Sequence, residues 1–90
     1  RQARVRVCIV LENLKGDPPT VSEVSRKTGI PQPTVSREVH RGLAWGYGTM
    51  IPDPEDERRQ LLVVSPERLK VYRRVFEEVF DGLEERDPDI

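Results

Sequence analysis

The stretch GIPQPTVSREVHRGLAWGYGTMIPDPEDERR, residues 29–59, decides the fold of this 90-residue chain. It opens with a Gly-Ile-Pro turn and continues into a basic segment in which Val35, Val39 and Leu43 recur at the spacing of one helix face. A short apolar run and a loop rich in Asp, Glu and Arg complete the stretch. We therefore expect a helix, a strand and a charged loop in immediate succession.

A second helix is predicted directly before this stretch. The sequence T-V-S-E, which begins at Thr20, is a capping box: the Thr20 hydroxyl accepts from the Glu23 N–H, and the Glu23 carboxylate accepts from the Thr20 N–H. The helix at residues 20–28 and the helix at residues 32–45 are then joined by the tight Gly-Ile-Pro turn. Two short helices joined in this way form a helix-turn-helix.

The order of the predicted elements defines the fold class. We expect one α+β domain over residues 1–90, mainly α with a small β-hairpin, in the arrangement of a winged helix-turn-helix with a long C-terminal helix. The other predicted elements are a first helix at residues 3–15, a wing hairpin at residues 47–65 with strands at 47–52 and 61–65, and a C-terminal helix at residues 66–86.

The net charge of −1 conceals a division along the chain. Residues 1–45 carry eight Lys and Arg against four Asp and Glu, whereas residues 46–90 carry seven against twelve. This asymmetry indicates one basic functional face and a separate acidic region. The alternative is a surface on which acidic and basic side chains form salt bridges with one another.

Several classes of function lack the residues they need. The single cysteine, Cys8, excludes an internal disulfide and a cysteine-built metal site, and the single histidine, His40, excludes a multi-histidine site. The sequence has no glycine-rich phosphate loop and no nucleophile–base pair, so we predict no metal, no cofactor and no enzymatic activity. No apolar run approaches the roughly 18 residues of a membrane span and no signal peptide is visible, so we expect a soluble, cytoplasmic protein without a membrane partner.

Three features together resemble the winged helix of MarR-family regulators. They are the sequence T-V-S-R at residues 34–37, the loop D-P-E-D at residues 53–56 followed by Arg58 and the strand at residues 61–64, and Gly46 at the position of the family's post-helix glycine. The resemblance covers about residues 20–68 and implies a DNA-binding regulator. Glu55 and Glu57 stand where members of that family usually carry basic wing residues.

The helix at residues 32–45, which follows the Gly-Ile-Pro turn, is the predicted recognition helix. An α-helix fits the major groove of DNA, where its N-terminal residues reach the base edges. Arg37 can bind guanine O6 and N7 in bidentate fashion and Gln32 can read adenine, whereas the alternative for Arg37 is a solvated or ion-paired side chain. The predicted recognition residues are Gln32, Pro33, Thr34, Ser36, Arg37, His40 and Arg41.

Contacts to the DNA backbone are predicted from the flanking segments. The helix that begins at Thr20 has free N–H groups and a positive dipole end, which suit a phosphate. Arg58 and Arg59 follow the wing loop and can approach the minor groove. We expect Asp53 or Asp56 to hold one of these arginines in place. The predicted phosphate and wing residues are Thr20, Ser22, Arg26, Lys27, Arg58 and Arg59.

The last predicted helix carries an apolar stripe whose members recur 3 and 4 positions apart, the period of a helix–helix seam. We expect this stripe to form the interface of a homodimer, and packing against the first helix is the alternative. The predicted interface residues are Leu69, Tyr72, Val75, Phe76, Val79, Phe80 and Leu83.

These features predict a sequence-specific transcriptional regulator that binds double-stranded DNA. We expect a repressor that occupies a pseudo-palindromic operator as a homodimer, because the two-fold symmetry of a dimer matches a palindromic site. The alternatives are a winged-helix module of a replication or partition protein and a protein–protein interaction domain. The sequence gives no indication of a small-molecule effector.

Overall fold

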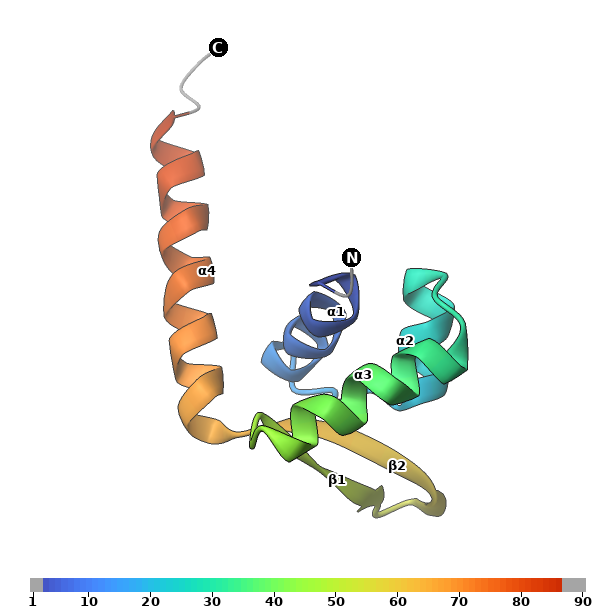
Figure 1. Cartoon of the computed structure of the whole chain (residues 1–90). Coiled ribbons are helices and arrows are strands. Elements are labelled where there is room, and N and C mark those ends of the chain that lie inside the picture. Colours follow the sequence, from blue (N-terminus) through green and yellow to red (C-terminus); the bar gives the residue numbers. More distant parts are fainter. Residues whose placement is uncertain (1–2, 87–90) are drawn as a thin grey trace.

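Six elements follow one another along residues 3–86 (Figure 1). The computed structural model describes residues 3–86, apart from the side chains of Phe80 and residues 83–86. Helices α1, α2 and α3 gather around a common centre, the hairpin extends beside them, and α4 rises at one side. This arrangement confirms the predicted winged helix-turn-helix with a long C-terminal helix. The elements are α1 (Ala3–Leu14), α2 (Val21–Thr28), α3 (Gln32–Ala44), β1 (Gly48–Asp53), β2 (Asp56–Val64) and α4 (Pro66–Arg86).

The helix-turn-helix is fixed by local hydrogen bonds. The capping box at the start of α2 is confirmed: Thr20 Oγ1 accepts from the Glu23 N–H at 3.1 Å, and Glu23 Oε1 accepts from the Thr20 N–H at 2.9 Å. Gly29 ends α2 with a φ of 77°, a left-handed conformation that glycine adopts without strain. The Ser25 hydroxyl then donates to the Ile30 carbonyl at 2.6 Å, which holds the turn into α3.

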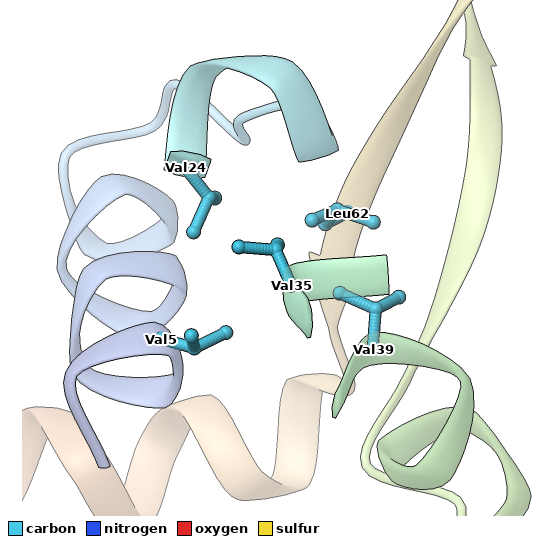
Figure 2. Packing of buried hydrophobic residues seen from close by; sticks show 5 residues of the cluster. All are labelled: Val5, Val24, Val35, Val39 and Leu62. Carbon is cyan, nitrogen blue, oxygen red and sulfur yellow. The ribbon is translucent and has the colours of Figure 1, made fainter. Parts of the chain in front are cut away.

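A cluster of five buried side chains from four elements forms the core (Figure 2). Val5 of α1, Val24 of α2, Val35 and Val39 of α3, and Leu62 of β2 are each at most 7% exposed. Val35 and Val39 lie one helical turn apart, so both point to the same side of α3. Half-buried side chains surround this cluster: Cys8, Ile9, Val21, Ile30, Leu43 and Met50.

β1 and β2 form an antiparallel hairpin. The paired residues run from Gly48 opposite Val64 to Pro52 opposite Gln60. A Cβ atom on Gly48 would overlap the carbonyl oxygen of Val63, so the close approach of the strands at this end requires glycine. Pro52 has no N–H and therefore donates no hydrogen bond from β1.

The second strand is longer than predicted. The prediction placed its start at residue 61, whereas β2 begins at Asp56, and only two residues separate it from the end of β1. Of residues 56–60, Gln60 pairs with Pro52 and Asp56 pairs with Asp53, with an irregularity in the register between the two pairs. The side chains of this segment are exposed or half-buried. Because neither face of this segment is buried, no apolar alternation marks it as a strand in the sequence.

The side chain of Asn13 joins the end of α1 to β2. Its Nδ2 donates to the carbonyl oxygens of Ile9 at 2.8 Å and Leu62 at 2.9 Å, and its Oδ1 accepts from the Val64 N–H at 3.0 Å. The Leu62 N–H donates to the Pro19 carbonyl at 2.8 Å. These bonds satisfy the backbone of β2 on the edge that faces away from β1, and Asn13 is 8% exposed. The end of α1 is thereby attached to the hairpin.

α4 is attached to the body near its first turns. The guanidinium of Arg68 lies 4.0 Å from the centre of the Tyr47 ring, a cation–π contact that joins α4 to the start of the hairpin. α4 also contacts α1, whereas its later turns stand apart from the three-helix body (Figure 1). Within residues 3–86, no helix combines the length and apolarity needed to cross a membrane.

The predicted apolar stripe of α4 divides into a half-buried and an exposed part. Val75 and Val79 are 48% and 51% exposed, and Val71, which the prediction did not include, is 61% exposed. These three valines lie four residues apart and therefore share one face of the helix. The side chains of Phe80 and Leu83 lie outside those described. The half-buried members are Leu69, Tyr72 and Phe76.

We expect Asn13→Ala to destabilise the fold because it leaves the Val64 N–H and the Leu62 carbonyl without partners. The loss should be roughly 1–3 kcal/mol for each buried group left unpaired. Urea denaturation followed by circular dichroism measures it. Gln60→Ala removes an exposed amide from the same strand and should leave the free energy of unfolding nearly unchanged. Equal stability of the two variants would contradict the role assigned to Asn13.

Candidate nucleic-acid interface

α3 separates an apolar inner face from a polar outer face. Val35 and Val39 turn into the core and are 0% and 7% exposed. The predicted recognition residues lie on the remaining circumference of α3, and most of their side chains are in contact with solvent. The exposed ones are Gln32, Pro33, Arg37, His40 and Arg41, and the half-buried ones are Thr34 and Ser36.

Two side chains on this outer face are partly oriented within α3. Arg37 Nη2 lies 3.5 Å from Thr34 Oγ1, and Arg37 forms no ion pair among the side chains that the structure describes, so its guanidinium is available to a ligand. His40 Nδ1 lies 2.8 Å from the Ser36 carbonyl oxygen. Because a carbonyl only accepts, Nδ1 is the donor in this contact.

A groove brings together residues from three segments that are separate in the sequence. It has a volume of about 530 Å³ and lies between the start of α2, the start of α3 and the hairpin. Six of the predicted DNA-contacting residues line it, so the fold gathers them on one surface. They are Thr20, Ser22, Arg26, Gln32, Arg58 and Arg59.

The two wing arginines have different surroundings. Arg58 Nε lies 3.4 Å from Asp56 Oδ1, and 93% of its side chain is exposed. Arg59 binds Asp53 Oδ2 through Nη1 at 3.3 Å and Glu23 Oε2 through Nη2 at 2.7 Å, and 42% of its side chain is exposed. The prediction that an aspartate of the wing loop holds an arginine is confirmed for both.

Glu23 is a partner of Arg59 that the prediction did not contain. The sequence identified Glu23 only as the acid of the capping box, and 36 residues separate it from Arg59. The capping box accounts for one oxygen of this carboxylate, which accepts from the N–H of the N-cap residue. It predicts no partner for the other oxygen. No local pattern identifies the partner of that second oxygen.

The start of α2 offers a smaller site than predicted. The Thr20 side chain already accepts from the Glu23 N–H, and Thr20 as a whole is 9% exposed. Ser22 is exposed, and so is Arg26 one turn further along α2. Ser22 and Arg26 are therefore the groups at this end that can approach a phosphate.

Lys27 lies in an ion-pair cluster between α1 and α2. Its Nζ is 2.9 Å from Glu12 Oε1, and Lys15 Nζ is 3.2 Å from Glu12 Oε2. The hydrogen bond with Lys27, followed by the weaker effect of the bond with Lys15, holds the pKa of Glu12 below its usual value. The bond with Glu12 in turn raises the pKa of Lys27. Burial, followed by the Glu12 charge, raises the pKa of the Cys8 thiol. The charge of Lys27 is thus already neutralised within the body.

A second pocket lies beneath the first turns of α4. It has a volume of about 300 Å³ and is bounded by α1, the end of α3 and the hairpin. Its walls include Val5, Ile9, Leu43 and Tyr72, and Trp45, which is 70% exposed, stands at its side. Of the predicted DNA-contacting residues, Arg41 alone reaches this pocket, and its guanidinium pairs with Glu38 at 3.2 Å. The pocket is therefore separate from the groove beside α2.

Comparison with known proteins agrees with this geometry. A family model described as MarR family matches residues 5–59, which include the helix-turn-helix and β1. The chain belongs to the MarR family. The predicted resemblance is therefore confirmed. A comparison with curated proteins gives no match.

Two solved structures of regulators share the fold. The transcriptional regulator Tm0710 from Thermotoga maritima is 30% identical with a TM-score of 0.71, and the match covers 90% of this chain and 57% of that one. The transcriptional regulator BldR from Sulfolobus solfataricus is 15% identical with a TM-score of 0.59, and the match covers 90% and 60%. The chain thus spans less than two thirds of either regulator.

The Glu12 cluster predicts a dependence of stability on pH. Because the pKa of Glu12 is lowered below its usual 4.5, the stabilisation is present above that value and is lost as the pH falls through the folded-state pKa. Glu12→Gln should therefore lower the melting temperature at pH 7, and the difference from the parent should shrink towards pH 3. Glu57→Gln, which removes an exposed wing carboxylate, is the control. A difference that stays constant with pH would contradict the assignment.

Proposed function

We propose that this chain is the DNA-reading part of a cytoplasmic transcriptional regulator that binds double-stranded DNA sequence-specifically. The regulator acts as a homodimer on a pseudo-palindromic operator and represses transcription by occluding the promoter. Membership of the MarR family and the similarity to two transcriptional regulators support a role in transcription.

The single observation that carries the proposal is the outer face of α3. An exposed polar face on a helix whose opposite face is buried can enter the major groove without disturbing the core. Arg37 forms no ion pair among the described residues and has the two parallel donors that guanine O6 and N7 require. Gln32, exposed at the start of α3, has the donor and the acceptor that adenine requires.

The groove beside α2 supports contacts to the DNA backbone on the same surface. Arg26 and Arg58 are exposed there and carry the positive charge that phosphates attract. Glu55 and Glu57 at the tip of the wing are also exposed and would be repelled by phosphates. We therefore assign the contact between the wing and the DNA backbone to Arg58, and we assign no such contact to Glu55 or Glu57.

The exposed valines of α4 support the homodimer. Val71, Val75 and Val79 form an apolar stripe on a helix about 30 Å long that the three-helix body leaves uncovered. A second copy of the chain would remove this stripe from water through a two-fold interface. Such a dimer would present two recognition helices, which fit half-sites one DNA turn, about 34 Å, apart.

Selection from random double-stranded DNA is the experiment that tests the proposal. The chain should enrich one inverted repeat, and fluorescence polarisation should give a higher affinity for that repeat than for its scrambled version. Cloned between a promoter and a reporter, the repeat should lower expression when the protein is present. Failure to enrich any sequence would overturn the proposal and favour a protein–protein interaction module.

We expect Arg37→Ala to abolish discrimination between the selected site and scrambled DNA. The cost should be about 1–3 kcal/mol for each lost base contact, since a bidentate arginine distinguishes guanine from other bases. Competition assays by fluorescence polarisation measure it. The melting temperature should not change, because Arg37 is exposed. Arg73→Ala removes an exposed arginine from α4 and should leave specificity intact. Full discrimination by Arg37→Ala would refute the recognition-helix assignment.

We expect Val75→Glu to convert a dimer into a folded monomer. A carboxylate in the middle of the apolar stripe would have to be buried without a partner in a dimer but stays in water in a monomer. Multi-angle light scattering measures the mass, and circular dichroism checks the fold. Gln60→Glu adds the same charge to the exposed hairpin and should remain dimeric. A monomeric parent, or a dimeric Val75→Glu variant, would count against this interface.

A further inference from the structure

The guanidinium of Arg59 connects three elements of the structure. Arg59 lies on β2, and its two terminal nitrogens reach Asp53 on β1 at 3.3 Å and Glu23 on α2 at 2.7 Å. The contact to Asp53 closes the hairpin across its two strands. The contact to Glu23 attaches the hairpin to the helix-turn-helix.

Glu23 uses its two carboxylate oxygens for two different tasks. Oε1 accepts from the Thr20 N–H and so caps α2, while Oε2 accepts from Arg59. One carboxylate therefore couples the start of α2 to the wing. A rotation of the wing away from α2 would break the bond to Arg59 but would leave the cap in place.

The outer half of the hairpin has little else to hold it. Leu62 of β2 is buried and Met50 of β1 packs against the core, whereas residues 55 and 57–60 are exposed. A two-stranded hairpin in water is marginally stable, so the direction of this segment depends on the contacts it makes with the body. Arg59 supplies such a contact.

We propose that Glu23 and Arg59 are positioning residues that set the angle of the wing relative to the recognition helix. Arg58 is the residue that meets the DNA backbone, and Arg59 does not contact DNA. Arg59 is held by two carboxylates, whereas 93% of the Arg58 side chain is exposed and open to a phosphate. This inference rests on the proposed function.

The two arginines also differ in what a phosphate would have to displace. A phosphate that bound Arg59 would have to replace two carboxylates, one of them at 2.7 Å. Among the described side chains Arg58 has one acid partner, Asp56, at 3.4 Å, and almost all of the Arg58 side chain is exposed. Of these two arginines, Arg59 has the shorter ion pairs and is therefore less available to a phosphate.

Glu23→Gln tests the proposal because glutamine also serves in a capping box. The variant keeps the cap of α2 but removes the charge that holds Arg59. If Arg59 positions the wing, affinity for the selected DNA should fall, by about fivefold for the loss of one such ion pair. If Arg59 is a phosphate contact, loss of its competing acid should raise affinity. Glu57→Gln, which removes an exposed wing acid, should raise affinity in either case.

The salt dependence of binding separates the two arginines. Each neutralised phosphate contributes about 0.9 to the slope of log affinity against log salt. Arg58→Ala should reduce that slope by about this amount per chain, whereas Arg59→Ala should lower affinity without changing the slope. A reduced slope for Arg59→Ala would overturn the proposal. The proposal would also be overturned if the affinity losses of Glu23→Gln and Arg59→Ala added up in the double variant. Both substitutions remove the same ion pair, which can be lost only once.

A measurement without DNA keeps this inference separate from the proposed function. Backbone order parameters from NMR should fall at residues 55–58 in Glu23→Gln and in Arg59→Ala, but not in Arg58→Ala. Unchanged order in the first two variants would overturn the positioning role even if the protein binds DNA. If the two variants loosened the wing but the protein selected no DNA sequence, the proposed function would be refuted. The positioning of the wing by Glu23 and Arg59 would still be supported.

Discussion

The carboxamide of Asn13 is the interaction on which the arrangement of the domain depends. β2 is bonded to β1 along one edge only, and the polar backbone groups of its other edge need partners where water is excluded. Asn13 supplies a donor to Leu62 and an acceptor to Val64 from one rigid group. Because Asn13 lies near the end of α1, this contact seats α1 on the hairpin, and Val5 then reaches the core that Val24 and the valines of α3 complete.

The two surfaces that we propose as DNA contacts are held in place by different forces. The rotation of α3 about its axis is set by the burial of Val35 and Val39, an apolar contact that is insensitive to salt. The direction of the wing is set by the ion pairs of Arg59, which are half-exposed and are therefore screened as salt rises. α3 thus remains oriented under conditions in which the wing loosens.

The sequence predicted the features that are determined within one or two helical turns. The capping box at Thr20 and the inward face of α3 are local patterns, and both are present. The start of β2 at Asp56 was missed because a solvent-exposed strand is held by backbone pairing and has no apolar signature. The contacts from Asn13 to Leu62 and from Glu23 to Arg59 span 49 and 36 residues, and nothing in the flanking sequence identifies these distant partners.

The closed edge of β2 also bears on how the molecule behaves at high concentration. A hairpin with open edges offers unpaired N–H and C=O groups on which strands of neighbouring molecules can stack into aggregates. On β2 the side chain of Asn13 and the carbonyl of Pro19 occupy these groups next to the core. On β1 the ring of Pro52 leaves a gap in the row of donors that an incoming strand would need. The features that seat the helices on the hairpin therefore also protect it against intermolecular β-sheet growth.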